Sequence, residues 1–154
     1  MPLMELSYQE GAISPATRDQ LVETLTTSLL KAEGAPNTEF FRGVTWVLVN
    51  ERPAELVYAG DRPGVGVVKL EVVTPEGALD DDRREQMIKA GTAAIREAFK
   101  VADEDALKVW VLCRDVVDGG WGAGGEVIHY EQLVEIAKAQ REAARAEAEP
   151  AGAA

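Results

Sequence analysis

Three arginines of this 154-residue chain are placed where they could bind an anionic substrate. Arg42, Arg52 and Arg114 lie at predicted strand ends or beside turns, from which a guanidinium can reach a pocket and bind a carboxylate. Aromatic side chains at strand spacing are candidates for the wall of such a pocket. They are Trp46, Tyr58, Trp110 and Trp121. The competing interpretation is structural, with the arginines in solvated salt bridges and the aromatic residues in the core or in a subunit contact.

Residues that bind metals or act as covalent nucleophiles are scarce. The chain has one histidine, His129, and one cysteine, Cys113, so neither a metal cluster nor an internal disulfide is expected. We expect His129 on the surface or capping the last helix, and Cys113 packed within a strand rather than reactive. The glycine-rich run at residues 120–125 does not join a first strand to a helix. It is therefore not predicted to bind a nucleotide.

The net charge limits the partners of the protein. Its 27 acidic and 16 basic residues give a formal charge of −11, which repels nucleic acid and anionic lipid. No leader opens the chain, and its apolar runs are too short to span a bilayer. We expect a cytoplasmic protein that acts on a small molecule, without nucleic acid or membrane partners.

A repeat organises the sequence. The stretch QEGAISPATRDQLV at residues 9–22 is echoed by PEGALDDDRREQMI at residues 75–88, at a shift of 66. The two stretches share the Glu-Gly-Ala triplet, an arginine and a glutamine. The repeat predicts two copies of one structural unit.

Each copy is predicted to have one strand before the echo and one strand after it. The runs are short and either β-branched or alternating, which is typical of strands. They are Pro2–Tyr8 and Trp46–Glu51 in the first copy, and Val68–Thr74 and Trp110–Asp115 in the second.

A helix is predicted between the two strands of each copy. Ser14 followed by proline, and Asp80 followed by two more aspartates, are typical helix starts. The helices are expected to end near Gly34 and Lys100. Apolar residues at helical spacing are expected to face inward. They are Leu21, Leu25, Leu29, Met87, Ile95 and Phe99.

Two tandem β-α-β units predict an α+β fold. Each unit has parallel strands around its helix, and the two units join edge to edge into a four-stranded mixed sheet with both helices on one face. We expect one domain, with units at about residues 2–66 and 67–126. Hairpin-like pieces are expected at Glu51–Gly66 and Asp118–Gly125. A helix from Gln132 is expected to fray in the alanine-rich tail of residues 127–154.

Several motifs together resemble the tautomerase superfamily. They are a Met-Pro start, a Glu-Gly turn between strand and helix, and the run WGAGGE at residues 121–126. The stretches ISP at residues 13–15 and VNERPAELVYAGD at residues 49–61 are similar to duplicated members such as the cis-3-chloroacrylic acid dehalogenase and malonate semialdehyde decarboxylase groups. The order and spacing of the motifs carry this resemblance over roughly residues 2–126. It implies a tautomerase/MIF-like fold without a metal or other cofactor.

The resemblance implies that Pro2 is catalytic. Removal of Met1 would expose the secondary amine of Pro2, and an α-amino group titrates near ~8 in water. Burial against apolar walls lowers that pKa towards neutrality, so the amine can act as a base. The second unit has Val68 at the matching position, so one active site per chain is expected. The competing interpretation of a proline at position 2 is protection of the chain terminus from modification.

The arginines of the family are missing from this chain. The pair that brackets the second Glu-Gly turn in the dehalogenases corresponds to Pro75 and Ala78. The two arginines of 4-oxalocrotonate tautomerase correspond to Ala12 and to Trp46 or Trp110. A pocket that holds tryptophan in place of arginine is expected to be drier, and to favour an aromatic or aliphatic substrate over a dicarboxylate.

The other dehalogenase residues are missing as well. Its helix histidine, strand tyrosine and water-activating glutamate fall near Leu29, Leu112 and Gly120. Hydrolytic dehalogenation is therefore not expected.

The function that we predict is that of a cofactor-independent tautomerase or isomerase acting on a small 2-oxo acid or enol. Pro2 is the predicted acid–base group, and Arg42, Trp46, Tyr58, Arg114 and Trp121 are the candidate substrate-binding residues. The alternatives are a lyase, either decarboxylase or hydratase/dehalogenase, on a small unsaturated or β-keto acid, and a non-catalytic trimeric scaffold. The resemblance also implies a homotrimer.

Overall fold

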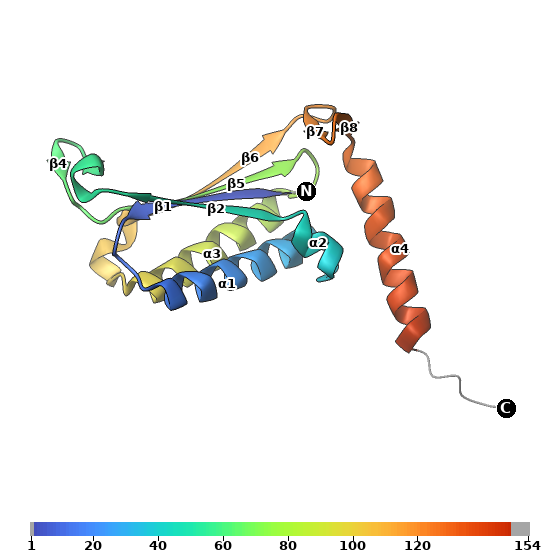
Figure 1. Ribbon diagram of the computed structural model, residues 1–154, viewed down its shortest axis with the longest axis horizontal. Helices are drawn as coiled ribbons and strands as arrows, with labels where there is room; N and C mark the ends of the chain where they lie inside the picture. The colour runs from blue at the N-terminus through green and yellow to red at the C-terminus, as the bar shows by residue number, and fades with distance from the viewer. Residues whose placement is uncertain (1, 149–154) are drawn as a thin grey trace.

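The computed structural model describes residues 2–148 and contains a four-stranded sheet in the order β2-β1-β5-β6 (Figure 1). The strands are β1 (Leu3–Gln9), β2 (Trp46–Arg52), β5 (Val68–Pro75) and β6 (Val109–Val116). β1 is parallel to β2 and β5 is parallel to β6, whereas β1 and β5 are antiparallel. The sheet is therefore mixed, as the repeat predicts.

Two long helices cover one face of this sheet. Figure 1 shows α1 (Pro15–Glu33) and α3 (Asp81–Phe99) side by side beneath the strands. The side chain of Ser14 accepts a hydrogen bond from the Thr17 amide at 3.2 Å, and that of Asp80 accepts one from the Arg83 amide at 2.9 Å. The predicted caps therefore start both helices. The α+β fold with two helices on one face is confirmed.

The Glu-Gly turn of the repeat has the same backbone geometry in both units. Gly11 has φ of 72° and Gly77 has φ of 89°, a left-handed conformation that residues with a Cβ rarely adopt. Each turn connects the first strand of its unit to the cap of its helix. The recurrence of the Glu-Gly pair in the sequence thus has a conformational reason.

The core lies between the sheet and the two helices. Alternate residues of β1 face the helices, and Met4 and Leu6 are fully buried there. The predicted inward residues Leu21, Leu25, Leu29, Met87 and Ile95 are buried, and Phe99 packs against them while partly exposed. The helical periodicity therefore predicted the buried faces correctly.

Shorter elements connect the units. The segment after β2 contains a 3₁₀ turn, η1 (Ala54–Leu56), and the short strands β3 (Tyr58–Ala59) and β4 (Arg62–Pro63). A short helix, α2 (Glu39–Gly43), precedes β2, and a second 3₁₀ turn, η2 (Asp103–Lys108), precedes β6. β7 (Trp121–Ala123) and β8 (Glu126–Ile128) form a hairpin after β6. The first predicted hairpin-like piece therefore contains two paired strands, β3 and β4, whereas the second contains β7 and ends one residue before its partner β8.

The C-terminal helix, α4, spans Tyr130–Ala148 and begins two residues before the predicted start. The side chain of Asp118 accepts a hydrogen bond from the Tyr130 amide at 3.0 Å, and that of Gln132 accepts one from the His129 amide at 2.9 Å. These two side chains satisfy amides at the start of the helix. The frayed end was predicted over residues 144–154, of which residues 144–148 are helical as part of α4 and residues 149–154 lie outside the described residues.

The face of the sheet opposite α1 and α3 exposes large apolar side chains. Trp46 is 64% exposed and Trp110 is 63% exposed, and Leu48 lies exposed on the same face as Trp46. No helix within residues 2–148 combines the length and the apolar character needed to cross a membrane.

Candidate active site

The start of β1, the end of β5, the end of α1 and the start of α3 lie together at one end of the sheet. α1 runs back antiparallel to β1, so its last residue, Glu33, returns to the end where Pro2 leads into β1. β5 is antiparallel to β1 and therefore finishes at this same end with Pro75, and α3 begins there with Asp81. Figure 1 shows the amino terminus, α2 and the start of α4 gathered at this end. The topology thus brings residues that are distant in sequence to the surroundings of Pro2.

Pro2 is buried and lines an apolar cavity of about 490 Å³. Its carbonyl accepts a hydrogen bond of 3.1 Å from the amide of Trp46, which joins it to the start of β2. The other residues around this cavity are apolar or glycine. They are Leu3, Gly43, Val44, Trp46, Trp121, Gly122, Ala123 and Gly124. No charged side chain is among these lining residues.

Only some of the predicted aromatic residues lie beside Pro2. Trp46 and Trp121 line its cavity. Tyr58 lies 57% exposed beyond the far end of β2, where it and Trp110 line a separate cavity of about 530 Å³. Within one chain, Tyr58 therefore does not belong to the Pro2 site.

The predicted arginines do not line the Pro2 cavity. The guanidinium of Arg42 is paired with Glu23 and donates to the side chain of Asn37 at 3.2 Å. Arg114 lies on the uncovered face of the sheet, where its Nε is 2.7 Å from Glu71 Oε1. Arg52 is paired in register with Gln9, at the opposite end of β1 from Pro2. Within one chain, the side chains of Arg42 and Arg114 are therefore paired with carboxylates, and Arg52 lies at the end of the sheet opposite Pro2.

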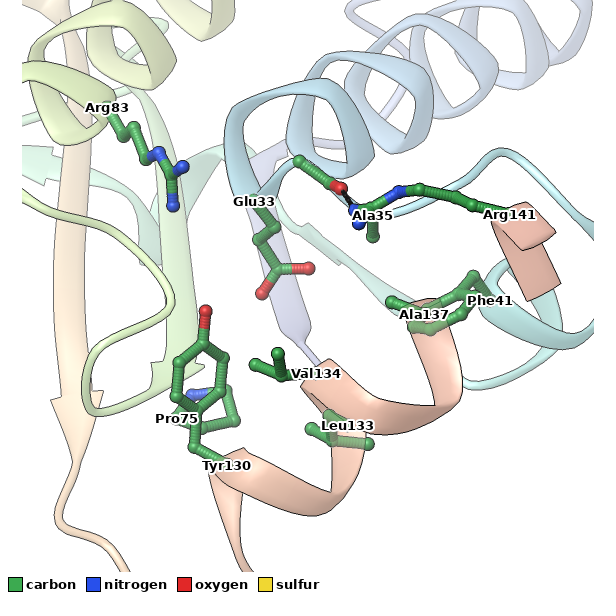
Figure 2. A pocket seen from close by; sticks show the side chains of 11 residues that line it. Glu33, Ala35, Phe41, Pro75, Arg83, Tyr130, Leu133, Val134, Ala137 and Arg141 are labelled. Carbon is green, nitrogen blue, oxygen red and sulfur yellow. Dashed lines mark hydrogen bonds between the residues drawn. The ribbon is translucent and has the colours of Figure 1, made fainter. Parts of the chain in front are cut away.

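A second cavity, of about 320 Å³, lies between the end of α1, the start of α3 and the first turns of α4 (Figure 2). We call it the charged pocket. Its polar side chains are Glu33, Arg83, Tyr130 and Arg141. Its apolar lining includes Phe41, Pro75, Leu133 and Val134. Figure 2 shows the carboxyl of Glu33, the hydroxyl of Tyr130 and the guanidinium of Arg83 directed into the same space.

Glu33 has an unusual protonation behaviour. It is partly exposed at the surface of the charged pocket, yet protein atoms surround most of its carboxyl group. This desolvation raises the pKa of Glu33 from 4.5 to about 7, although the positive charge at the amino end of the chain opposes the rise. At neutral pH the carboxyl is therefore able both to donate and to accept a proton.

Arg83, in the first turn of α3, contributes to the charged pocket. Its Nη1 donates to the carbonyl oxygen of Ala78 at 3.4 Å, and its Nε is 3.6 Å from the carboxylate of Asp80. Its Nη2 is directed towards Gly34, 4.0 Å from where a Cβ would stand on that glycine. Two of its nitrogens thus hold the side chain against the turn before α3, and the third reaches the end of α1.

Tyr130 packs on the second Glu-Gly turn. A Cβ placed on Gly77 would lie 3.2 Å from Tyr130 Cδ1 and 3.3 Å from Tyr130 Cε1, tighter than ordinary contacts. The ring therefore lies against the bare backbone of this glycine. The contact fixes the first residue of α4 beside Pro75, which lines the same pocket.

Polar contacts hold α4 over the charged pocket at both of its ends. His129 Nδ1 lies 2.7 Å from Asp118 Oδ2, and the amide of Asp118 donates to Glu76 Oε2 at 3.2 Å. The hydrogen bond from His129 is the largest cause that lowers the pKa of Asp118. Further along, Thr38 donates to Gln140 Oε1 at 2.6 Å, and Arg141 donates to the carbonyl oxygen of Gly34. The predicted surface position of His129 is correct, and the residue also helps to anchor the helix.

Cys113 packs against the core as predicted, and burial raises the pKa of its thiol. Among residues 2–148 there is no group of three or more side chains suited to hold a metal ion.

Sequence reasoning missed the charged pocket. Glu33 reads as an ordinary charge at a helix end, and Tyr130 falls before the predicted start of the last helix. The order of the elements could have indicated that Glu33 lies near Pro2, because a β-α-β crossover returns the end of its helix to the start of its first strand.

The fold is that of tautomerase-superfamily structures. Pt0534, solved after inactivation by 2-oxo-3-pentynoate, aligns with a TM-score of 0.70 at 20% identity, over 85% of this chain and 98% of that one. The wild-type fused 4-OT Q0, a symmetric trimer, aligns with a TM-score of 0.68 at 19% identity, over 84% and 96%. N1, a member of the cis-3-chloroacrylic acid dehalogenase family, aligns with a TM-score of 0.70 at 16% identity, over 91% and 96%.

Neither a model of a known protein family nor a curated protein sequence matches the chain. The similarity therefore lies in the fold, and the chemistry has to be argued from the site.

Proposed function

We propose that the protein is a cofactor-independent tautomerase or isomerase that uses the amine of Pro2, freed by removal of Met1, on a small 2-oxo acid or its enol. The observation that carries this proposal is the position of Pro2. It is buried at the start of an inner strand of the sheet and lines an apolar cavity of about 490 Å³. This size suits a small organic acid.

The environment of Pro2 favours a neutral amine. Its cavity is lined by Leu3, Val44 and the two tryptophans Trp46 and Trp121. An ammonium ion loses solvation in such surroundings, which favours the neutral form of the amine. A neutral amine can take the hydroxyl proton of an enol and return a proton to the neighbouring carbon, which converts the enol to the ketone.

The lining of the cavity also supports a preference among substrates. The positions that correspond to family arginines in the sequence hold Ala12, Pro75, Ala78 and either Trp46 or Trp110. Trp46 offers an indole surface in place of a charge. An enol with an aromatic or aliphatic body and one carboxylate therefore suits the site better than a dicarboxylate.

We propose further that the protein assembles as a homotrimer. The exposed side chains of Trp46, Leu48 and Trp110 on the uncovered face of the sheet support an interface there, since large apolar patches on soluble proteins mark contact surfaces. The fused 4-OT of similar fold is a symmetric trimer. Light scattering at micromolar concentration is expected to give a trimer mass, and a monomer mass would refute the assembly.

The ketonisation of phenylenolpyruvate tests the enzymatic proposal. The processed protein is expected to accelerate it. The comparison is a protein with one extra residue ahead of Pro2, which turns the amine into a tertiary amide without basicity. Intact mass spectrometry establishes which form is present. Equal rates for the two forms would show that Pro2 is not the base, and no acceleration by the processed form would favour a scaffold.

A further inference from the structure

The charged pocket holds an acid that the Pro2 mechanism does not yet use. We propose that Glu33 is a second proton-transfer group of the Pro2 site, so that the amine and the carboxyl serve the two ends of the enol. This inference rests on the proposed tautomerase function. It adds a residue from the end of α1, where the sequence singled out no candidate.

The geometry of the sheet places the charged pocket next to Pro2. Leu3 is paired in register with Val73, so Pro2 lies across from Thr74 and beside Pro75. Neighbouring strands are ~5 Å apart, and Pro75 lines the same cavity as Glu33. The edge of the charged pocket is therefore about one strand spacing from Pro2.

Pro2 and Glu33 also lie on the same side of the sheet. Side chains alternate along a strand, so Pro2 shares the helix-facing side with the buried residues Met4 and Leu6. α1 covers that side and ends with Glu33. A substrate that fills the Pro2 cavity and extends past the start of β1 to the helix side would therefore meet the end of α1.

The charges around Glu33 suit an acid–base role. The charged and polar groups that line the pocket with it are Arg83 from α3 and Tyr130 and Arg141 from α4. The positive charge at the amino end of the chain also acts on the carboxyl group of Glu33. Arg141 donates to the carbonyl oxygen of Gly34, and Arg83 reaches the end of α1 through Nη2. Since desolvation holds the pKa of Glu33 at about 7, the protonated and ionised forms are both available at neutral pH. An acid or base is most effective when its pKa lies near the working pH.

The proton balance is complete with these two groups. The neutral amine of Pro2 takes the hydroxyl proton of the enol, and the protonated carboxyl of Glu33 gives its proton to the neighbouring carbon. The product is the ketone, and the protein is left with an ammonium at Pro2 and a carboxylate at Glu33. Transfer of one proton from the ammonium to the carboxylate restores the starting state. No oxidant, metal or other reactant is needed.

Glu33→Gln tests the proposal, with Glu55→Gln on the exposed turn η1 as the matched control. The assays are phenylenolpyruvate ketonisation between pH 5 and 9 and covalent labelling by 2-oxo-3-pentynoate, the reagent that inactivates Pt0534. We expect kcat of Glu33→Gln to fall by about 10²-fold or more, with a much smaller change in KM. The change in kcat of wild type near pH 7, where Glu33 titrates, should be absent from the variant. Pro2 of the variant should still be labelled by 2-oxo-3-pentynoate. Glu33→Asp, which keeps the acid on a shorter side chain, should recover part of kcat.

A wild-type kcat and pH profile in folded Glu33→Gln would overturn the role of Glu33 and leave that of Pro2 intact. A wild-type protein that neither ketonises the enol nor is labelled at Pro2 would overturn the proposed function and this inference with it. If Glu33→Gln does not fold, ¹³C NMR of the glutamate carboxyls in the wild-type chain provides the test. Labelling of Pro2 should shift the titration midpoint near pH 7, and an unchanged midpoint would overturn the proposal.

Discussion

Replacement of Glu33 by glutamine should change how stability depends on pH. In the unfolded chain the carboxyl ionises at its ordinary pKa of 4.5, whereas the folded protein holds the proton up to about pH 7. Between these values the folded state binds more protons than the unfolded state, so the free energy of unfolding falls as the pH rises. The contribution is fully present below pH 4.5 and is lost above pH 7.

The size of this effect follows from the two pKa values of Glu33. At 1.36 kcal/mol for each pH unit, the rise from 4.5 to about 7 corresponds to roughly 3 kcal/mol, and water in the charged pocket would reduce this value. Glutamine does not titrate, so the variant should lack this loss. Its stability relative to wild type should rise by about 2–3 kcal/mol between pH 4.5 and 7.5.

Urea unfolding followed by circular dichroism at several pH values measures this difference. Glu55→Gln is the control, because its side chain lies on the surface and its difference from wild type should stay within about 0.5 kcal/mol across the range. If the free energy of unfolding of Glu33→Gln differs from that of wild type by the same amount at every pH, the pKa of Glu33 is not raised in the folded protein.

Three further outcomes are expected. Gly77→Ala should destabilise the protein by about 1–3 kcal/mol in urea unfolding, because alanine there combines a left-handed backbone with a clash against Tyr130. Gly11→Ala is the matched control, since its backbone is also left-handed but its surroundings are open, and an equal loss in both variants would contradict the ring contact. Asp118→Ala should speed amide hydrogen exchange in the first turn of α4. The hydrogen bonds to Asp118 lower its pKa, so in wild type this protection should be present above pH 4 and lost as the pH falls further, and unchanged exchange in the variant would show that other contacts anchor the helix. In kinetic assays kcat/KM should be higher for phenylenolpyruvate than for 2-hydroxymuconate, because each missing arginine removes a charge-assisted contact of about 1.5–3 kcal/mol. A strong preference for the dicarboxylate would show that another cation, such as Arg83, has taken over its binding.

The fold could be predicted because its determinants are local and occur twice. The caps Ser14 and Asp80 start the helices, the glycines of the Glu-Gly turns end the strands, and helical periodicity marks the buried faces. Each signal lies within one β-α-β unit, and the second unit repeats it. Pairing of the two units then follows from the need to cover one face of the sheet.

The surroundings of Pro2 were predicted only in part, because strand direction decides which turns lie beside it. β1 and β2 are parallel, so Trp46 at the start of β2 lies next to Pro2, whereas Tyr58 after the end of β2 lies at the far end of the sheet. Arg114 is two strands away and paired with Glu71. Proximity to a turn was therefore an insufficient criterion for a site residue.

The charged pocket depends on tertiary contacts that no local pattern reveals. Burial raises the pKa of Glu33, and the first turns of α4 form part of the pocket that surrounds it. The docking of α4 depends on contacts between residues far apart in the chain, such as Thr38 with Gln140 and Arg141 with Gly34. The sequence predicted this helix but not the surface on which it packs.

Covalent labelling by 2-oxo-3-pentynoate tests the central claim most directly, because an amine adds to this electrophile without a leaving group. The protein without Met1 should gain the mass of one reagent molecule, and peptide mapping should place the adduct on Pro2. The form with an extra residue ahead of Pro2 should remain unlabelled. Labelling of both forms to the same extent, or an adduct at another residue such as Cys113, would contradict a reactive amine at Pro2.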